Sequence, residues 1–150
     1  MREINKIIIH CSATKEGQNY TVSQIDSWHK QRGFSKIGYH YVVYLDGTYH
    51  RGRQDAEVGA HCTGHNKDSI GICYIGGLDK NGKSKDTRTE AQKKTIITLI
   101  RTLKARYPSI KEVIGHRDTS PDLNKNGVIE PKEYLKDCPC FNAKEEYKNI

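Results

Sequence analysis

The hydrophobic positions of this chain form short β-rich runs separated by longer amphipathic stretches. Residues 6–11 contain three consecutive isoleucines, which indicates a short strand buried on both faces in the middle of a sheet. Comparable runs predict further strands at residues 37–45, 48–53, 69–77 and 111–116. Asp46-Gly47 separates two of these runs and is a strong hairpin signal.

Two stretches have helical periodicity and helix start signals. Thr21 opens the first, Gly33 ends it, and its predicted buried stripe consists of Val22, Ile25, Trp28 and His29. Thr89 and Gln92 form a predicted capping box at the start of the longer helix. Its apolar stripe continues to Tyr107. Strands separated by helices, together with one hairpin, predict an α/β fold with a central mixed sheet flanked by helices.

Length and composition favour one domain over residues 1–150. A chain of this size buries about 70% of its unfolded surface and needs no disulfide or metal cross-links to fold. No apolar run approaches the roughly 20 residues of a membrane span. The first six residues lack the apolar core of a secretion signal, so we expect synthesis in the cytoplasm, and we expect a monomer.

The net charge limits the classes of partner, and the cysteine content limits the role of the thiols. The net charge of +7 favours acidic partners, but the lysines are scattered and no nucleic-acid-binding signature is present. We therefore expect no nucleic-acid partner. Five cysteines in a chain without a signal indicate reduced thiols with a metal or catalytic role, in preference to a disulfide framework.

Candidate metal ligands lie where predicted strands end. His10 and His116 each close an apolar run, and Cys138 and Cys140 flank Pro139 further along. Zinc binds imidazole and thiolate, and catalytic sites use three protein ligands. The pattern alone is compatible with either cysteine as the third ligand, and with histidines that only cap strands.

Alternation along the predicted strands assigns neighbouring side chains to opposite faces. It places Tyr39 and His40 on opposite faces, so only one of them can face a cleft. It also turns Cys11 away from any site used by His10, which makes Cys11 a buried small hydrophobe.

Six segments occur in this order along the chain: residues 9–14, 28–30, 38–41, 59–61 with Asn66, 69–72, and 136–139 with Phe141. Together they resemble the zinc-dependent N-acetylmuramoyl-L-alanine amidases of the phage-lysozyme type, which are relatives of the peptidoglycan recognition proteins. The similarity covers nearly the whole chain.

The resemblance implies a zinc ion on the floor of an open groove, held by His10, His116 and Cys138. It implies a catalytic tyrosine at Tyr39 and a catalytic lysine at Lys136. With Tyr39 in that role, strand alternation turns Tyr39 toward the groove and His40 toward the core. The implied reaction is hydrolysis, by zinc-activated water, of the amide between N-acetylmuramic acid and the L-alanine of the stem peptide. In such a reaction an ammonium can stabilise the oxyanion and a phenol can orient water.

The implied partner is peptidoglycan, reached after release or delivery to the cell wall. His61 and Asn66 lie in a glycine-punctuated loop and are expected to contact sugar or peptide. Two other functions fit the same resemblance: a non-catalytic peptidoglycan-recognition module, and a phage regulatory protein that binds RNA polymerase.

Residues 122–133 match the ligand pattern of an EF-hand loop and form an apparent insertion, because the family members compared have a shorter connection here. The predicted calcium ligands are Asp122, Asn124, Asn126, Val128 and Glu133. Calcium would stiffen the segment that leads to Lys136 and Cys138. Pro121 precludes an ordinary incoming helix, and the alternative is an Asx-rich turn held by its own side chains.

Overall fold

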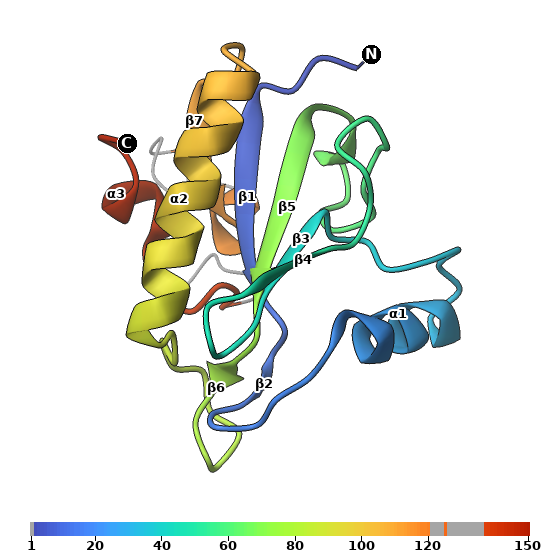
Figure 1. The fold of residues 1–150 in the computed structure, drawn as a ribbon, viewed down its shortest axis with the longest axis vertical. Coiled ribbons are helices and arrows are strands. Elements are labelled where there is room, and N and C mark those ends of the chain that lie inside the picture. Colours follow the sequence, from blue (N-terminus) through green and yellow to red (C-terminus); the bar gives the residue numbers. More distant parts are fainter. Residues whose placement is uncertain (1, 121–124, 126–136) are drawn as a thin grey trace.

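The structure is a computed structural model and describes residues 2–120, 125 and 137–150. It has one α/β domain (Figure 1). The strands are β1 (Lys6–Cys11), β2 (Thr14–Lys15), β3 (Tyr41–Val43), β4 (Tyr49–Arg51), β5 (Ser69–Tyr74), β6 (Gly77–Leu78) and β7 (Glu112–Gly115). The helices are α1 (Val22–Gln31), α2 (Glu90–Arg106) and α3 (Ala143–Glu146), with short 3-10 turns η1 (Asn66–Asp68) and η2 (His116–Thr119).

The central sheet is mixed, as predicted. Its strand order is β4-β3-β5-β1-β7, so the isoleucine-rich β1 lies inside the sheet. β1 is parallel to both β5 and β7, β3 is parallel to β5, and β4 is antiparallel to β3. β2 and β6 form a separate small parallel sheet. Parallel pairing matters for the site because it places the carboxyl ends of neighbouring strands at one edge.

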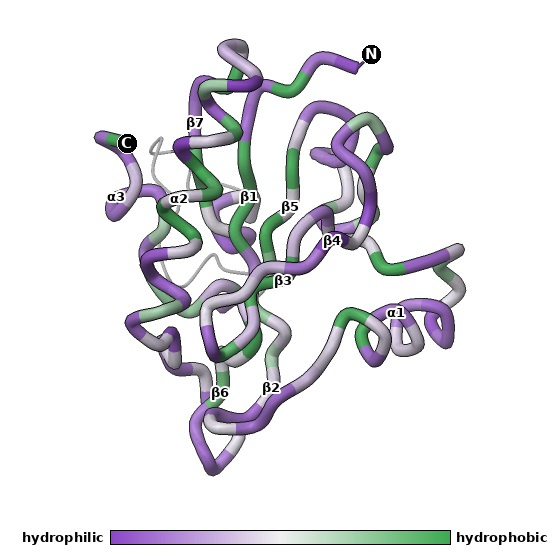
Figure 2. Tube along the Cα trace, in the orientation of Figure 1, coloured by the Kyte–Doolittle hydropathy of each residue, from purple (hydrophilic) through white to green (hydrophobic). Residues whose placement is uncertain are grey.

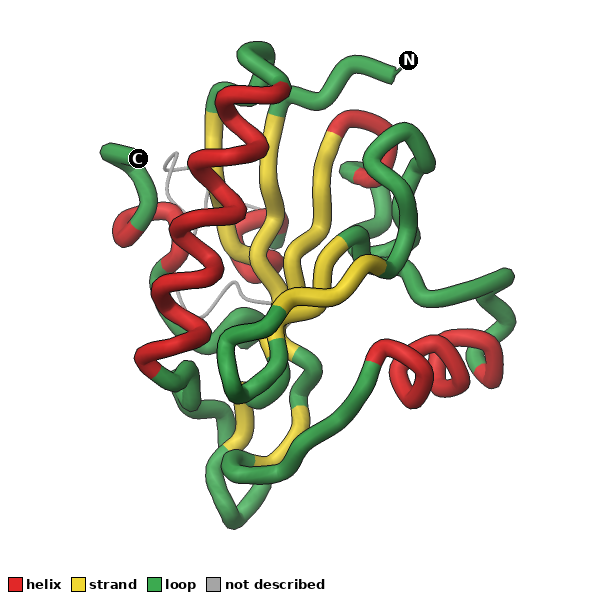
Figure 3. The backbone as a smooth tube through the Cα atoms, viewed as in Figure 1, coloured by secondary structure: helices red, strands yellow, loops and turns green. Residues whose placement is uncertain are grey.

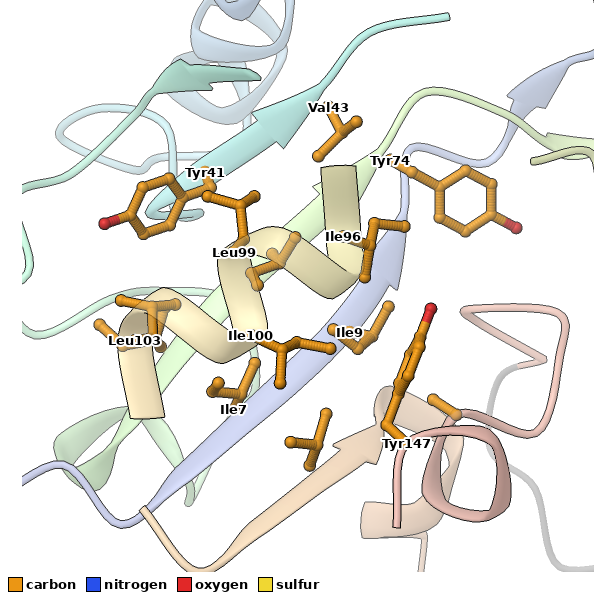
Figure 4. Packing of buried hydrophobic residues seen from close by; sticks show 14 of the residues in the cluster. Ile7, Ile9, Tyr41, Val43, Tyr74, Ile96, Leu99, Ile100, Leu103 and Tyr147 are labelled. Atoms are coloured by element: carbon orange, nitrogen blue, oxygen red, sulfur yellow. The ribbon is translucent and has the colours of Figure 1, made fainter. Parts of the chain in front are cut away.

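Helix α2 covers one face of the sheet. The predicted capping box is present, with Thr89 and Gln92 bonding reciprocally. The apolar stripe of the helix packs on the isoleucines of β1 and on β3 (Figure 4). Hydrophobic positions accordingly follow the strands and the inner side of α2 (Figure 2).

Alternation within β1 divides its side chains between two faces. Ile7, Ile9 and Cys11 belong to the core beneath α2, whereas Ile8 packs on the opposite face with Cys62. His10 shares the face of Ile8. Cys11 is 5% exposed and packs in the main core, which confirms the prediction for this residue.

Helix α1 lies between two loops (Figure 3), and its Ile25 packs with Val42 of β3 on the face of the sheet opposite α2. Its Thr21–Gln24 capping box is present, and Ile25 and His29 are buried. The prediction that Trp28 belongs to the buried stripe is wrong, because this indole is 36% exposed. Only a narrow strip of the helix, Ile25 and His29, is buried, and Trp28 lies beside it against Tyr20.

The predicted strand over residues 37–45 is shorter in the structure. Only β3 is a regular strand. Ahead of it the N–H groups of Ile37 and Gly38 donate to the side chains of Asp26 and His29, whereas His40 N still donates to Gly71 O of β5. The hairpin through Gly47 is confirmed. Tyr39 and His40 lie on the predicted sides.

His40 is completely buried, and both of its ring nitrogens form hydrogen bonds with backbone groups. Its Nδ1 accepts from Gly71 N at 3.1 Å, and its Nε2 donates to Glu57 O at 2.8 Å. This arrangement suits a neutral ring. Burial lowers the pKa of His40 to about 4.

Protonation of His40 is therefore expected to destabilise the fold in mild acid. Because the pKa is lower in the folded chain, the unfolded chain binds more protons as the pH falls from about 6.5 towards about 4. Each pH unit in this interval should cost up to about 1.4 kcal/mol of unfolding free energy. Denaturant titrations at pH 7 and pH 5 should show this loss. His40→Gln should be less stable than the wild type, and its unfolding free energy should depend less on pH. An equal slope in both proteins would contradict the assignment.

Within the described ranges, 2–120 and 137–150, no helix has the length and apolar character needed to cross a lipid bilayer.

Candidate active site

Two histidines meet at the carboxyl edge of the sheet. β1 and β7 are parallel neighbours with Ile9 opposite Gly115, so the next residues, His10 and His116, lie side by side. Their ring centroids are 4.7 Å apart. Strand register therefore brings together two residues that are far apart in the sequence.

Cys138 reaches the same edge from the C-terminal segment. Its Sγ accepts a hydrogen bond from Cys11 N at 3.1 Å, and Tyr74 Oη donates to Pro139 O at 2.6 Å. Gly115 permits this approach, because a Cβ there would lie 2.7 Å from Pro139 Cδ. A glycine next to the second histidine is thus needed for close packing of the cysteine loop.

The three side chains form a group that could hold a metal ion. Their ligand atoms all lie within 4.8 Å of one another, and His10 Nδ1 is 3.9 Å from Cys138 Sγ. Tetrahedral zinc with nitrogen and sulfur ligands requires separations of roughly 3.3–3.6 Å. The donor set and its spacing fit zinc with small side-chain adjustments.

Cys140 lies elsewhere. Its Sγ is 3.2 Å from Gly77 O and 3.9 Å from Cys11 Sγ. Of the two cysteines that the sequence left as alternatives, it is Cys138 that lies beside the histidines. All five cysteines carry free thiols.

A cavity of about 630 Å³ opens beside this group. Its lining includes His116 and Cys138 on one side and Tyr39 on another. The Tyr39 ring lies 5.1 Å from that of His10 and 5.3 Å from that of His29. Burial, reinforced by the neighbouring Cys73 thiol, raises the pKa of Tyr39 well above its ordinary value. The phenol is therefore a neutral donor beside the candidate ligands.

Helix α1 and the loop after it supply the outer wall of the cavity. Trp28, Arg32 and Phe34 line it, and the Arg32 guanidinium lies 5.2 Å from the centroid of the Phe34 ring. An aromatic wall with a cation suits a ligand that has both apolar and polar surfaces.

Comparison with known proteins identifies the family. The family model described as N-acetylmuramoyl-L-alanine amidase matches residues 1–132. The chain belongs to this family. The endolysin of Enterobacteria phage T3 is 38% identical over 138 residues, which cover 92% of this chain and 82% of that protein.

Two solved structures have the same fold as this amidase. The N-acetylmuramoyl-L-alanine amidase LysC from Clostridium intestinale is 30% identical with a TM-score of 0.73, covering 97% of this chain and 82% of that chain. Bumblebee PGRP-SA is 25% identical with a TM-score of 0.74, covering 99% and 83%. The predicted family and fold are confirmed, and the endolysin and amidase relatives support a peptidoglycan hydrolase.

The amidase cavity also contains both predicted groove residues. His61 is only 7% exposed, and its ring nitrogens lie 2.8 Å from His10 Nε2 and 3.2 Å from Ser69 Oγ. Asn66 Oδ1 accepts from the backbone N–H groups of His61 and Cys62. Contact of His61 and Asn66 with substrate stays a prediction.

The sequence interpretation did not single out Ser69. It begins a strand whose cavity-side positions, Ser69, Gly71 and Cys73, are all small, whereas the opposite positions are large and apolar. Small residues at every second position of a buried strand indicate that a ring or a backbone segment packs flat against it. This pattern of small residues can be recognised in the sequence. In the structure, the ring that packs against them is that of His61.

The remaining predicted site residues of the amidase lie outside the described residues. They are Lys136 and the calcium ligands Asp122, Asn124, Asn126, Val128 and Glu133. Apart from Lys125, the predicted insertion at 122–133 lies there as well.

A buried arginine anchors the C-terminal segment that contains the candidate cysteine ligand. The Arg88 side chain is 2% exposed, and its guanidinium donates to Asp86 and, through two nitrogens, to Glu146. It also donates to Tyr147 Oη and lies 3.3 Å from the centroid of the Phe141 ring. One side chain thus connects the start of α2 to the last residues of the amidase.

Replacing Arg88 by methionine is expected to lower the unfolding free energy by about 2–3 kcal/mol. This is below the usual cost of breaking a buried ion pair, because Asp86 and Glu146 are themselves partly exposed and can be rehydrated. Denaturant titration measures the change, and Arg101→Met, at an exposed position of α2, is the control. Equal stability of the two variants would show that the anchor contributes nothing.

Proposed function

We propose that this chain is a zinc-dependent amidase that cleaves the bond between N-acetylmuramic acid and the L-alanine of the stem peptide. The observation that carries the proposal is the convergence of His10, His116 and Cys138 within 4.8 Å beside a large cavity. Membership of the N-acetylmuramoyl-L-alanine amidase family supports the choice of bond.

His10, His116 and Cys138 would hold the zinc ion. When bound, zinc acts as a Lewis acid that polarises a carbonyl and makes a water molecule acidic. Three protein ligands leave a fourth position for reactants. The cavity beside the ligands has room for a glycopeptide segment to approach that position.

Tyr39 supplies a neutral hydroxyl at the cavity wall. Because its pKa is raised, it keeps its proton throughout the neutral range and can donate a hydrogen bond as charge develops on the amide oxygen. Its ring packs against His10 and His29, which holds the phenol in place.

In this proposal Lys136 supplies a positive charge in addition to that of the zinc ion. It precedes Cys138 by two positions in the sequence. An ammonium near the developing oxyanion stabilises it electrostatically, and such stabilisation is often the largest single contribution to catalysis. The substrate is peptidoglycan, and the endolysin relatives support action at the cell wall.

The test is digestion of purified cell walls with the whole protein, with and without a chelator. We expect chelation to stop the release of soluble fragments and added zinc to restore it. Mass spectrometry of the products should show stem peptides with a free L-alanine amino group and glycan strands with an intact lactyl group. Cleavage of a glycosidic bond, or release that is indifferent to chelation, would overturn the proposal. Wall binding without release would indicate a recognition module.

A further inference from the structure

The candidate ligand His10 has an unusual partner on its second ring nitrogen. Histidines that bind a metal commonly donate that N–H to a carboxylate, a backbone carbonyl or water. Here His10 Nε2 lies 2.8 Å from Nδ1 of another imidazole, His61, and both rings are buried. The two rings meet edge to face, with centroids 4.9 Å apart.

The hydrogen-bond partners determine which nitrogen carries each proton. Ser69 Oγ donates its single proton to His65 O at 2.6 Å, since a carbonyl can only accept. Ser69 Oγ therefore accepts from His61 Nε2 at 3.2 Å. With its proton on Nε2, a neutral His61 accepts at Nδ1, so His10 donates from Nε2.

The consequence is a defined tautomer of His10. With the proton on Nε2, the lone pair is on Nδ1. Nδ1 is the atom that lies 3.9 Å from Cys138 Sγ, on the side of the candidate metal position. The chain of bonds thus presents the correct nitrogen of His10 to a metal ion.

Two glycines hold the His61 ring in a slot. A Cβ on Gly71 would lie 2.7 Å from His61 Cγ, and a Cβ on Gly59 would lie 2.6 Å from His61 Cδ2. Cβ atoms in proteins essentially never come this close to another heavy atom, so a side chain at either position would force the His61 ring to shift. The backbone on both sides, together with the Asn66 bond to His61 N, leaves the ring little freedom.

We propose that Ser69 and His61 are positioning residues that hold His10 in the Nε2–H tautomer and so prepare its Nδ1 to bind zinc. This inference rests on the proposed zinc function. In this assignment His61 acts on the metal centre through His10. A neutral imidazole partner orients the ligand without adding the negative charge that a carboxylate would place beside the thiolate.

The experiment measures zinc affinity and histidine tautomers in the whole protein. Zinc affinity is obtained by competition with a chromogenic chelator, and tautomers from two-bond nitrogen–proton NMR spectra of the zinc-free chain. We expect the wild type to show His10 protonated on Nε2. Ser69→Ala should mix the two tautomers of His61 and His10 and weaken zinc binding roughly 10-fold, the lower end of the range for such partners.

Three further variants separate positioning from general destabilisation. Ser69→Thr keeps the hydroxyl and should restore both the tautomer and the affinity. Ile70→Val disturbs the neighbouring position of the same strand on the α2 face and should leave zinc affinity unchanged. Gly71→Ala should displace the His61 ring and weaken zinc binding at least as much as Ser69→Ala.

The outcomes distinguish the two proposals. A wild-type chain that binds no zinc overturns the proposed function. A wild type that binds zinc while Ser69→Ala binds it equally well overturns the positioning role alone. His10 protonated on Nδ1 in the zinc-free wild type would also overturn it.

Discussion

Replacing Cys138 by serine is expected to remove most of the bound zinc and to lower turnover on cell walls by more than about 100-fold. Loss of a partner that only orients a ligand costs roughly 10–100-fold, and loss of a ligand should cost more. The hydroxyl of serine is a poor zinc ligand at neutral pH because, unlike the thiol, it is not readily deprotonated. Metal analysis of the purified protein and fragment release from walls measure the two effects.

The chain contains its own control for this prediction. Cys140 lies two residues further on, and its Sγ is directed to Gly77 O. Cys140→Ser should therefore keep zinc and most of the activity. If Cys140→Ser loses zinc and Cys138→Ser keeps it, the ligand assignment is reversed.

Tyr39→Phe is expected to lower kcat by about 10²–10³-fold while zinc content stays at the wild-type level. Removing one donor to a developing oxyanion has an effect of this size. The phenyl ring preserves the packing against His10 and His29, so the metal ligands should not move. Steady-state rates on a soluble muropeptide, together with metal analysis, separate catalysis from metal binding.

Tyr49→Phe is the matched control, because Tyr49 is 56% exposed on the edge strand β4. Its activity should equal that of the wild type. Full turnover in Tyr39→Phe would exclude the hydroxyl from the reaction. A parallel loss of zinc and rate would instead assign Tyr39 to support of the ligand His10.

Local patterns in the sequence predict much of this fold because the interactions behind them are local. Both capping boxes, the α2 stripe and the Asp46-Gly47 hairpin involve residues a few positions apart. The isoleucine run of β1 predicts an interior strand because few other environments accept β-branched side chains on both faces. Family resemblance added the candidate site residues to this picture.

Other features depend on how elements approach one another. Trp28 continues a helical stripe, yet it is exposed because α1 contacts the domain along a narrow strip. The strand predicted from residue 37 starts only at Tyr41, and the N–H groups of Ile37 and Gly38 bond to Asp26 and His29 instead of to a neighbouring strand. Periodicity does not show which surface an element meets.

By itself the sequence determined an α/β domain, the boundaries of its two longer helices and a short set of candidate metal ligands. The family resemblance implied Cys138, whereas the residue pattern left Cys140 open. The tertiary structure places Cys138 beside the histidines, and it alone shows that His61 contacts His10. These choices depend on strand register and on contacts between residues more than 50 positions apart. Such contacts form when a whole sheet assembles, so no local stretch of the chain encodes them alone.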